Sequence, residues 1–219
     1  MPVKFNQYWR IIHDRYADYG TFIIKEFIPG INQLGIHTVA GWSVAVGGYS
    51  EIIFEGVTAD LNLLEEALRN VEYKKLHDNL LNYVKNYKNK VLVSNSSAES
   101  YSMDIKENTV KFTQTWDVIS SKNTDYEKFI AQEFFPCLEQ LGIQVAGEWE
   151  VLIGDGPRTI CEGRANDISS IIPSLHGPIF KKAKHGLKQF VENYESRLLS
   201  FHIQKVKGYK SASYNLIPD

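Results

Sequence analysis

The chain has 219 residues, 43% of them hydrophobic and 12% aromatic, so it can bury one large core or the cores of two domains of about 100 residues. Its formal net charge is −2, and lysine and arginine are spread along the chain, which leaves no basic stripe for nucleic acid. No apolar run approaches the roughly 18 residues of a membrane span, and the first ten residues lack a signal-peptide pattern. We therefore expect a cytoplasmic protein that binds neither nucleic acid nor membrane.

In chain order, the first predicted element is a strand at 4–12, which is rich in aromatic and branched residues. A helix follows, and its apolar face consists of Ile23, Phe27, Ile31 and Leu34. Gly35 should end this helix, and Pro29 inside it should remove a backbone hydrogen bond and bend it. Two strands at 36–48 and 50–58, joined by a glycine-containing turn, come next.

Two further helices complete the predicted first half. Asp60 has the position of an N-cap residue at the start of a short helix. A longer helix is expected to begin near Tyr73, because apolar residues continue at helical spacing. Its apolar face would consist of Tyr73, Leu76, Leu80, Val84, Tyr87 and Val91. The predicted order of elements in this half is βαββα.

The second half repeats the first. Shifting the sequence by 107 positions aligns 4–90 with 111–197 without a gap, and 30 of the 87 aligned positions are identical. The identical pairs include Lys4/Lys111, Gln7/Gln114, Trp9/Trp116, Pro29/Pro136, Gly35/Gly142, Trp42/Trp149, Glu55/Glu162 and Asp60/Asp167. This pattern indicates a tandem duplication of one folding unit.

The repeat predicts the domain boundaries and the fold class. We expect units at 1–93 and 110–203, a polar, Ser-rich linker at 94–109 and a C-terminal tail at 204–219. Each unit would be α+β, with an antiparallel sheet whose helices cover one face and leave the other bare. Two copies in one chain can cover each other's bare faces, which favours an internal pseudo-dimer that closes an α/β barrel.

The repeated order EF-x-P, QLG-I, W-x-V and EG, followed by the helix pattern YKKLHDNLL or FKKAKHGLK, resembles the NIPSNAP-like group of the dimeric α/β-barrel superfamily. The resemblance covers both repeats and implies tandem ferredoxin-like units. Relatives in that superfamily include cofactor-free monooxygenases, isomerases, haem-degrading enzymes and chlorite dismutases. The resemblance therefore implies a fold and leaves several activities open.

Candidate site residues are the polar and aromatic strand positions that both copies share. A buried carboxylate at Glu55 or Glu162 could act as a general base or acid, although backbone or lysine hydrogen bonds would equally explain these residues. Six further residues could line a ligand pocket or fill the core: Gln7, Trp9, Trp42, Gln114, Trp116 and Trp149.

His77 is a third catalytic candidate, because it matches a helix histidine that the resemblance implies for haem-degrading and antibiotic-biosynthesis relatives. The second copy has Lys184 at this position, and other features of the haem-degrading group are missing. A surface histidine is the alternative. We therefore expect no cofactor and no metal site, and keep haem as a minor possibility.

Two kinds of function remain open from the sequence. One is a small-molecule enzyme of the cofactor-independent monooxygenase or isomerase type with an apolar, Trp-lined pocket. The other is a non-enzymatic binding or assembly protein, and pseudo-dimers of either kind could form homo-oligomers. Cys137 and Cys161 are expected to be buried thiols. The polar differences His37/Gln144 and Ser43/Glu150 favour an active site in one half only.

Overall fold

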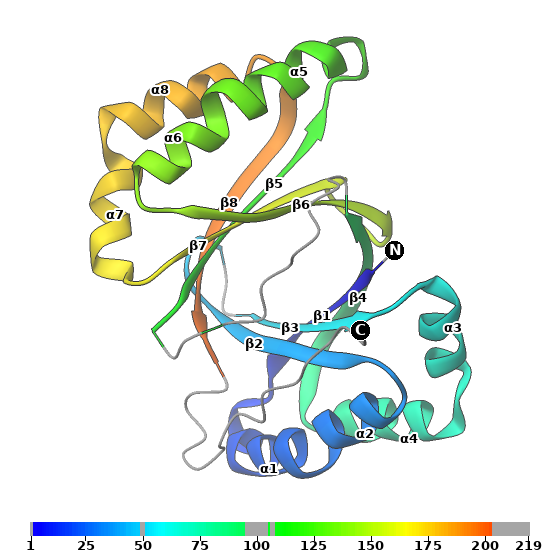
Figure 1. Ribbon diagram of the computed structural model, residues 1–219. Coiled ribbons are helices and arrows are strands. Elements are labelled where there is room, and N and C mark those ends of the chain that lie inside the picture. The colour runs from blue at the N-terminus through cyan, green and yellow to red at the C-terminus, as the bar shows by residue number, and fades with distance from the viewer. Residues whose placement is uncertain (1, 49–50, 95–104, 106–107, 203–219) are drawn as a thin grey trace. The chain divides into compact units, whose positions relative to one another are not determined.

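The computed structural model describes residues 2–48, 51–94, 105 and 108–202, and they divide into two compact units (Figure 1). Unit 1 contains the described residues up to Trp42, those of Glu51–Asn89, and His202. Unit 2 contains the described residues of Ser43–Ser50 and Lys90–Phe201. The predicted tail at 204–219 lies outside the described residues, and so does most of the predicted linker at 94–109.

The first repeat folds in the order strand, helix, two strands, helix and strand. Its strands are β1 (Val3–Ile11), β2 (His37–Val46), β3 (Ile52–Thr58) and β4 (Val84–Ser94). Its helices are α1 (Tyr16–Phe22), α2 (Ile28–Gln33), α3 (Leu61–Arg69) and α4 (Val71–Leu80). β1 and β3 are antiparallel, with Asn6 opposite Glu55 and Phe5 opposite Gly56.

The second repeat has the same elements in the same order. Its strands are β5 (Val110–Val118), β6 (Gln144–Ile153), β7 (Thr159–Ala165) and β8 (Val191–Phe201). Its helices are α5 (Asn123–Phe129), α6 (Phe135–Gln140), α7 (Ile168–His176) and α8 (Pro178–Leu187). β5 lies between β7 and β8, and β6 pairs with both β7 and the end of β4. The hydrogen-bonded order β1-β3-β2-β8-β5-β7-β6-β4 closes into a barrel, so the predicted fold class is confirmed.

The predicted long helix from Tyr73 to Val91 is wrong in its second half. α4 ends at Leu80, and the chain then forms β4, so each repeat is βαββαβ. Asn86 has a φ of 57°, and its counterpart Asn193 in β8 has a φ of 54°. In β8 this residue coincides with a shift of register against β5, which is the mark of a β-bulge. A bulge breaks the period-2 alternation and leaves apolar residues at spacings of three and four, which imitate a helix.

In the first helical region of each repeat, a π-helical turn precedes the proline. A π-helical turn at Ile23–Phe27 precedes α2, and the N–H of Ile28 bonds to the carbonyl of Ile23. This wider turn occurs just before Pro29, which has no N–H to donate. The second repeat has the same turn at Ile130–Phe134 before Pro136.

Gly35 and Gly142 end α2 and α6 with φ values of 84° and 78°, a left-handed conformation that glycine adopts without strain. Asp60 and Asp167 cap α3 and α7, since their carboxylates accept backbone N–H bonds from Leu63 and Ser169. The sequence therefore placed these helix ends correctly.

The core of unit 2 lies between its strands and its helices. α5, α6 and α8 lie on one face of the strands (Figure 1), and the buried side chains between them include Phe112, Trp116, Phe134, Leu138 and Phe180. Cys161 is fully buried in this core, as predicted, whereas Cys137 on α6 is only half-buried, because its sulfur faces the backbone carbonyl of the exposed Ile179 at the start of α8.

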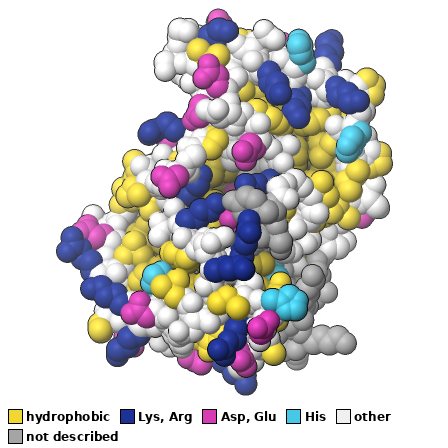
Figure 2. Space-filling view, turned by 180° about the vertical axis from the view of Figure 1, so that it is seen from behind, with side chains coloured by type: hydrophobic (Ala, Val, Ile, Leu, Met, Phe, Trp, Pro, Cys, Tyr) yellow, Lys and Arg dark blue, Asp and Glu magenta, His cyan; other side chains and the backbone are white. Residues whose placement is uncertain are grey.

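On the face seen in Figure 2, lysine and arginine side chains are interspersed with aspartate and glutamate. Within the described residues, every helix is too short or too polar to cross a membrane.

Candidate functional site

The two strand-one tryptophans are buried and hydrogen-bonded to tyrosines. Trp9 Nε1 donates to Tyr19 Oη at 3.0 Å, and Trp116 Nε1 donates to Tyr126 Oη at 2.9 Å. Both indoles are fully buried. Trp9 and Trp116 thus anchor the first helix of each unit to the first strand.

The shared glutamines also bond to tyrosines. Tyr87 Oη donates to Gln7 Oε1 at 2.9 Å, and Tyr194 Oη donates to Gln114 Oε1 at 2.7 Å. Both glutamines are fully buried beneath the helices. Burial raises the pKa of Tyr194 above its ordinary value, so this phenol stays protonated and remains a donor.

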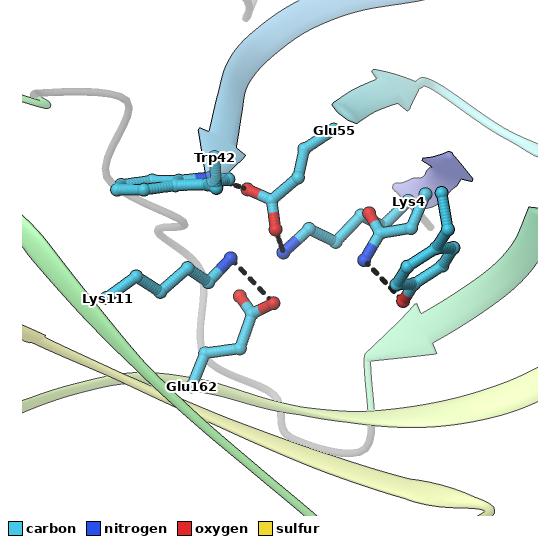
Figure 3. Close-up of polar contacts among 7 residues, drawn as sticks. Lys4, Trp42, Glu55, Lys111 and Glu162 are labelled. Atoms are coloured by element: carbon cyan, nitrogen blue, oxygen red, sulfur yellow. Dashed lines mark hydrogen bonds and ion pairs between the residues drawn. The ribbon is translucent and has the colours of Figure 1, made fainter. Parts of the chain in front are cut away.

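Glu55 and Glu162 are each buried in an ion pair with a lysine (Figure 3). In unit 1, Lys4 Nζ lies 3.2 Å from Glu55 Oε1, and Trp42 Nε1 donates to Glu55 Oε2 at 2.9 Å. In unit 2, Lys111 Nζ lies 2.7 Å from Glu162 Oε1. The side chains of both pairs are at most 1% exposed.

Each carboxylate has a lysine as its partner, as expected for buried charges, which are normally paired. The proposed catalytic role of Glu55 and Glu162 stays a prediction. Trp149, the counterpart of Trp42, packs in a small apolar cluster with Leu92, Val151 and Ile160.

His77 lies on α4 with its ring against two tyrosines. Its centroid is 4.6 Å from that of Tyr87 in an edge-on arrangement and 6.2 Å from that of Tyr73. In unit 2 the ammonium of Lys184 takes the same place, 4.7 Å from the centroid of the Tyr194 ring. The two side chains therefore share a packing role over the equivalent tyrosine.

A pocket of about 870 Å³ lies in unit 2, between α5 with its π-helical turn and β6. Its apolar walls come from Val118, Ile130, Phe135, Val145 and Ala146. Its polar lining includes Asp117, Asn123, Tyr126, Glu127, Glu148, Glu150 and Arg158. A second pocket of about 540 Å³, lined by Asp117, Gly156, Pro157, Asn193, Tyr194 and Glu195, adjoins it through Asp117. The predicted site residues Glu55, Glu162 and His77 and the four tryptophans line neither of these two pockets.

A directed hydrogen-bond chain runs into the larger pocket. An indole N–H can only donate, so Tyr126 Oη accepts from Trp116 and turns its own proton toward Glu148. Tyr126 Oη donates to Glu148 Oε1 at 3.2 Å. Burial, and then the charge of Glu148, raise the pKa of Tyr126 well above its ordinary value. Tyr126 is therefore a permanent donor that holds the Glu148 carboxylate at the pocket wall.

Unit 1 has the same Trp–Tyr pair without the carboxylate. The position of Glu148 is occupied by Gly41, and the position of Glu127 by Gly20. Here the backbone N–H of His202 bonds to the carbonyl of Gly41 at 2.7 Å, and the His202 ring lies 6.2 Å from that of Tyr19. The two units thus share a scaffold and differ in the chemistry beside it.

The sequence prediction missed Glu148 because it weighed residues that both copies share. Comparison of the repeats already contained the signal, since Gly41/Glu148 differs as sharply as Ser43/Glu150, two positions later. The Trp–Tyr contact that makes this position chemically distinct depends on the fold of α5 over β5, which the sequence pattern does not specify.

The described residues hold no group of three or more His, Cys, Asp or Glu side chains arranged for a metal ion.

Comparison with known proteins adds information on the fold. No protein-family model and no curated protein matches the chain. A candidate monooxygenase from Fusobacterium nucleatum is 11% identical, with a TM-score of 0.63, over 91% of this chain and 92% of that one. An anthrone oxidase-like protein is 9% identical, with a TM-score of 0.59, over 92% of this chain and 91% of that one.

The chain has the dimeric α/β-barrel fold. Similar structures also include a NIPSNAP domain protein from Burkholderia xenovorans, which is 14% identical, has a TM-score of 0.37 and covers 46% of this chain and 100% of that one. The matches to the candidate monooxygenase and the anthrone oxidase-like protein, each over more than 90% of both chains, confirm the fold that the sequence resemblance implied. In this dimeric α/β barrel, both halves belong to one chain.

Proposed function

We propose that unit 2 is a small-molecule active site in which Glu148 acts as a general base. One observation carries the proposal: a pocket of about 870 Å³ contains a carboxylate that a buried tyrosine holds in place. Pockets of this size accommodate drug-sized organic molecules. The apolar walls would bind the body of the substrate, and Glu148 would reach its acidic proton.

The chemistry follows from what Glu148 and Tyr126 can do together. An oriented carboxylate can remove a proton from a carbon next to a carbonyl or from a phenol. Tyr126 keeps one oxygen of Glu148 hydrogen-bonded and fixes the direction of the other. The resulting carbanion could be reprotonated elsewhere, which is isomerisation, or react with dioxygen. Neither step requires a metal or haem.

The names of two proteins with the same fold support the oxygen branch. One is described as a candidate monooxygenase and another as anthrone oxidase-like. Anthrone has an acidic C–H next to its aromatic rings and is therefore a suitable first substrate. Anthrone and one dioxygen give anthraquinone and one water, so the overall reaction balances without a further reductant.

The test compares Glu148→Gln with the intact protein in oxygen uptake and anthraquinone absorbance. We expect the rate of anthrone oxidation to fall by about 100-fold or more, the usual contribution of a general base. Glu133→Gln, on the exposed side of the π-helical turn, is the matched control and should keep the full rate. Equal rates for the two variants would reject Glu148 as the base.

A binding protein without turnover is the second candidate. It is favoured by the four buried tryptophans and by the lysine partners of Glu55 and Glu162, because these residues fill the interior rather than line the two pockets. Binding of small aromatic compounds, with no turnover of anthrone or of other carbon acids, would favour this function.

A further inference from the structure

Negatively charged side chains outnumber positively charged ones on the described walls of the unit 2 pocket. Among its described lining residues, four carry a carboxylate, Asp117, Glu127, Glu148 and Glu150, and one, Arg158, carries a guanidinium. Four negative charges and one positive charge give a formal charge of −3. A cleft with low-dielectric walls concentrates such a field on whatever enters it.

The guanidinium of Arg158 is already paired with a carboxylate. Arg158 Nη2 lies 3.6 Å from Glu150 Oε1. Asp117 accepts from the backbone N–H of Arg158 and from Asn193 Nδ2, each at 2.8 Å, and Glu127 accepts from Asn123 Nδ2 at 2.8 Å. These backbone and amide donors are neutral, so they orient the carboxylates without cancelling their charge.

The fold does not need this acidity. At the positions equivalent to the four acids, the first repeat has Arg10, Gly20, Gly41 and Ser43, and in place of Arg158 it has Glu51. That set has a formal charge of zero. Because both units fold alike, packing cannot be the reason for four acids around the pocket of unit 2.

From this charge, the apolar walls and the size of the pocket, we infer that its substrate is an organic cation, an amine with an aromatic or other apolar body. The inference rests on the proposed small-molecule site and names its substrate class. Val118, Ile130 and Phe135 would hold the apolar body, and the carboxylates would favour the ammonium group. The same field would disfavour carboxylate and phosphate compounds.

The test uses three probes of one shape and different charge: 1-naphthylmethylamine, 1-naphthalenemethanol and 1-naphthoate. Binding is measured by calorimetry at low salt and located by amide shifts of Gln144–Glu150 in NMR spectra. We expect the amine to bind at least tenfold more tightly than the naphthoate, with the alcohol between them. Added salt should narrow the difference, because it screens charges near solvent.

Two variants should move the preference in opposite directions. Glu127→Gln with Glu150→Gln removes two negative charges and should bring the amine and the naphthoate within about threefold of each other. Arg158→Gln removes the positive charge and should widen the difference. Glu133→Gln, outside the pocket, should change neither affinity. General damage to the fold could not produce shifts of both signs.

Equal affinities, tighter binding of the naphthoate, or no binding of any probe at these amides would overturn the inference. The outcome is separable from that of the proposed reaction. Amine-selective binding without turnover of any carbon acid would retain the substrate class and reject the general-base role. Turnover of anthrone without amine selectivity would retain the general-base role and reject the substrate class.

Discussion

At the scale of single residues, the two units show how one contact can have two uses. The indole of Trp9 or Trp116 holds a tyrosine in both units, and only in unit 2 does the tyrosine pass the hydrogen bond on to a carboxylate. Trp116 is thus a positioning residue that acts on Glu148 through Tyr126. Its role can be separated from packing because Trp9 makes the same hydrogen bond to a tyrosine and stacks on the equivalent Tyr87 without the acid, although it also stacks on Phe54, whose counterpart is Cys161.

We predict that Trp116→Phe lowers kcat for anthrone oxidation at least tenfold, whereas Trp9→Phe leaves it nearly unchanged. Each variant leaves a buried tyrosine oxygen without its donor, so each should lose about 2 kcal/mol of stability in urea unfolding. Steady-state kinetics and unfolding curves of both variants provide the check. A similar loss of kcat in both would mean that the tryptophan acts only through stability.

The buried ion pairs illustrate what the sequence could reveal at this scale. Lys4/Lys111 and Glu55/Glu162 are identical in both copies, so their importance was visible. Their partnership depends on register: Asn6 is opposite Glu55, and Lys4 lies two residues from Asn6 on the same face of the sheet. Register is a property of paired strands and cannot be read from one strand alone. For this reason a lysine could be expected as a partner of these carboxylates, but Lys4 and Lys111 could not be named as the partners.

At the scale of elements, helix ends and strands require glycine for different physical reasons. A Cβ at Gly142 would meet nothing within 4 Å, so only its φ of 78° resists substitution. A Cβ at Gly163 in β7 would collide with Cγ2 of Ile143. The first constraint is conformational and the second is steric.

We predict that Gly142→Ala costs about 1 kcal/mol, the strain of a left-handed non-glycine residue. Gly163→Ala should cost more, about 2 kcal/mol, because Ile143 must move within a packed core. Urea unfolding measures both. Gly163→Ala with Ile143→Val should recover part of the loss, whereas Ile143→Val should not rescue Gly142→Ala. If Gly142→Ala lost more stability than Gly163→Ala, the assignment of a conformational constraint to Gly142 and a steric one to Gly163 would be wrong.

Sequence patterns predicted most elements and failed at the last strand of each repeat, β4 and β8. Helix ends at Gly35 and Gly142 and caps at Asp60 and Asp167 depend on local chemistry, and they were correct. β4 was mistaken for helix because Val84, Tyr87 and Val91 follow one another in the sequence at the spacing of a helix face. The left-handed Asn86 interrupts the alternation of the strand, so a strand can have this spacing too. A bulge is stabilised by the neighbouring strand, which local patterns do not contain.

At the scale of the whole molecule, the compact units do not follow the repeats. Two segments of the first repeat belong to unit 2. They are the end of β4, where Val91–Ser94 pairs with β6, and the described residues of Ser43–Ser50. Ser43 Oγ lies 2.9 Å from Ser200 Oγ in β8. The compact units therefore have other boundaries than the repeats from which the domains were predicted.

We predict that the fragment 108–219 does not fold alone, because β6 would lose its β4 partner and expose an unpaired edge. The longer fragment 90–219 restores Val91–Ser94 and should be more soluble and better folded. Dispersion of amide signals in NMR spectra and light scattering would measure the difference. A well-dispersed, monomeric fragment 108–219 would show that the repeat is an independent domain.

The contrast between Gly41 and Glu148 has a genetic consequence. In a dimer of identical chains, one codon would specify both positions, and a mutation that adds an acid to one pocket would add it to the other. Here two codons specify them, so selection can act on Glu148 while Gly41 keeps its backbone hydrogen bond with His202. Because the two copies are fused in one chain, each half can mutate independently of the other.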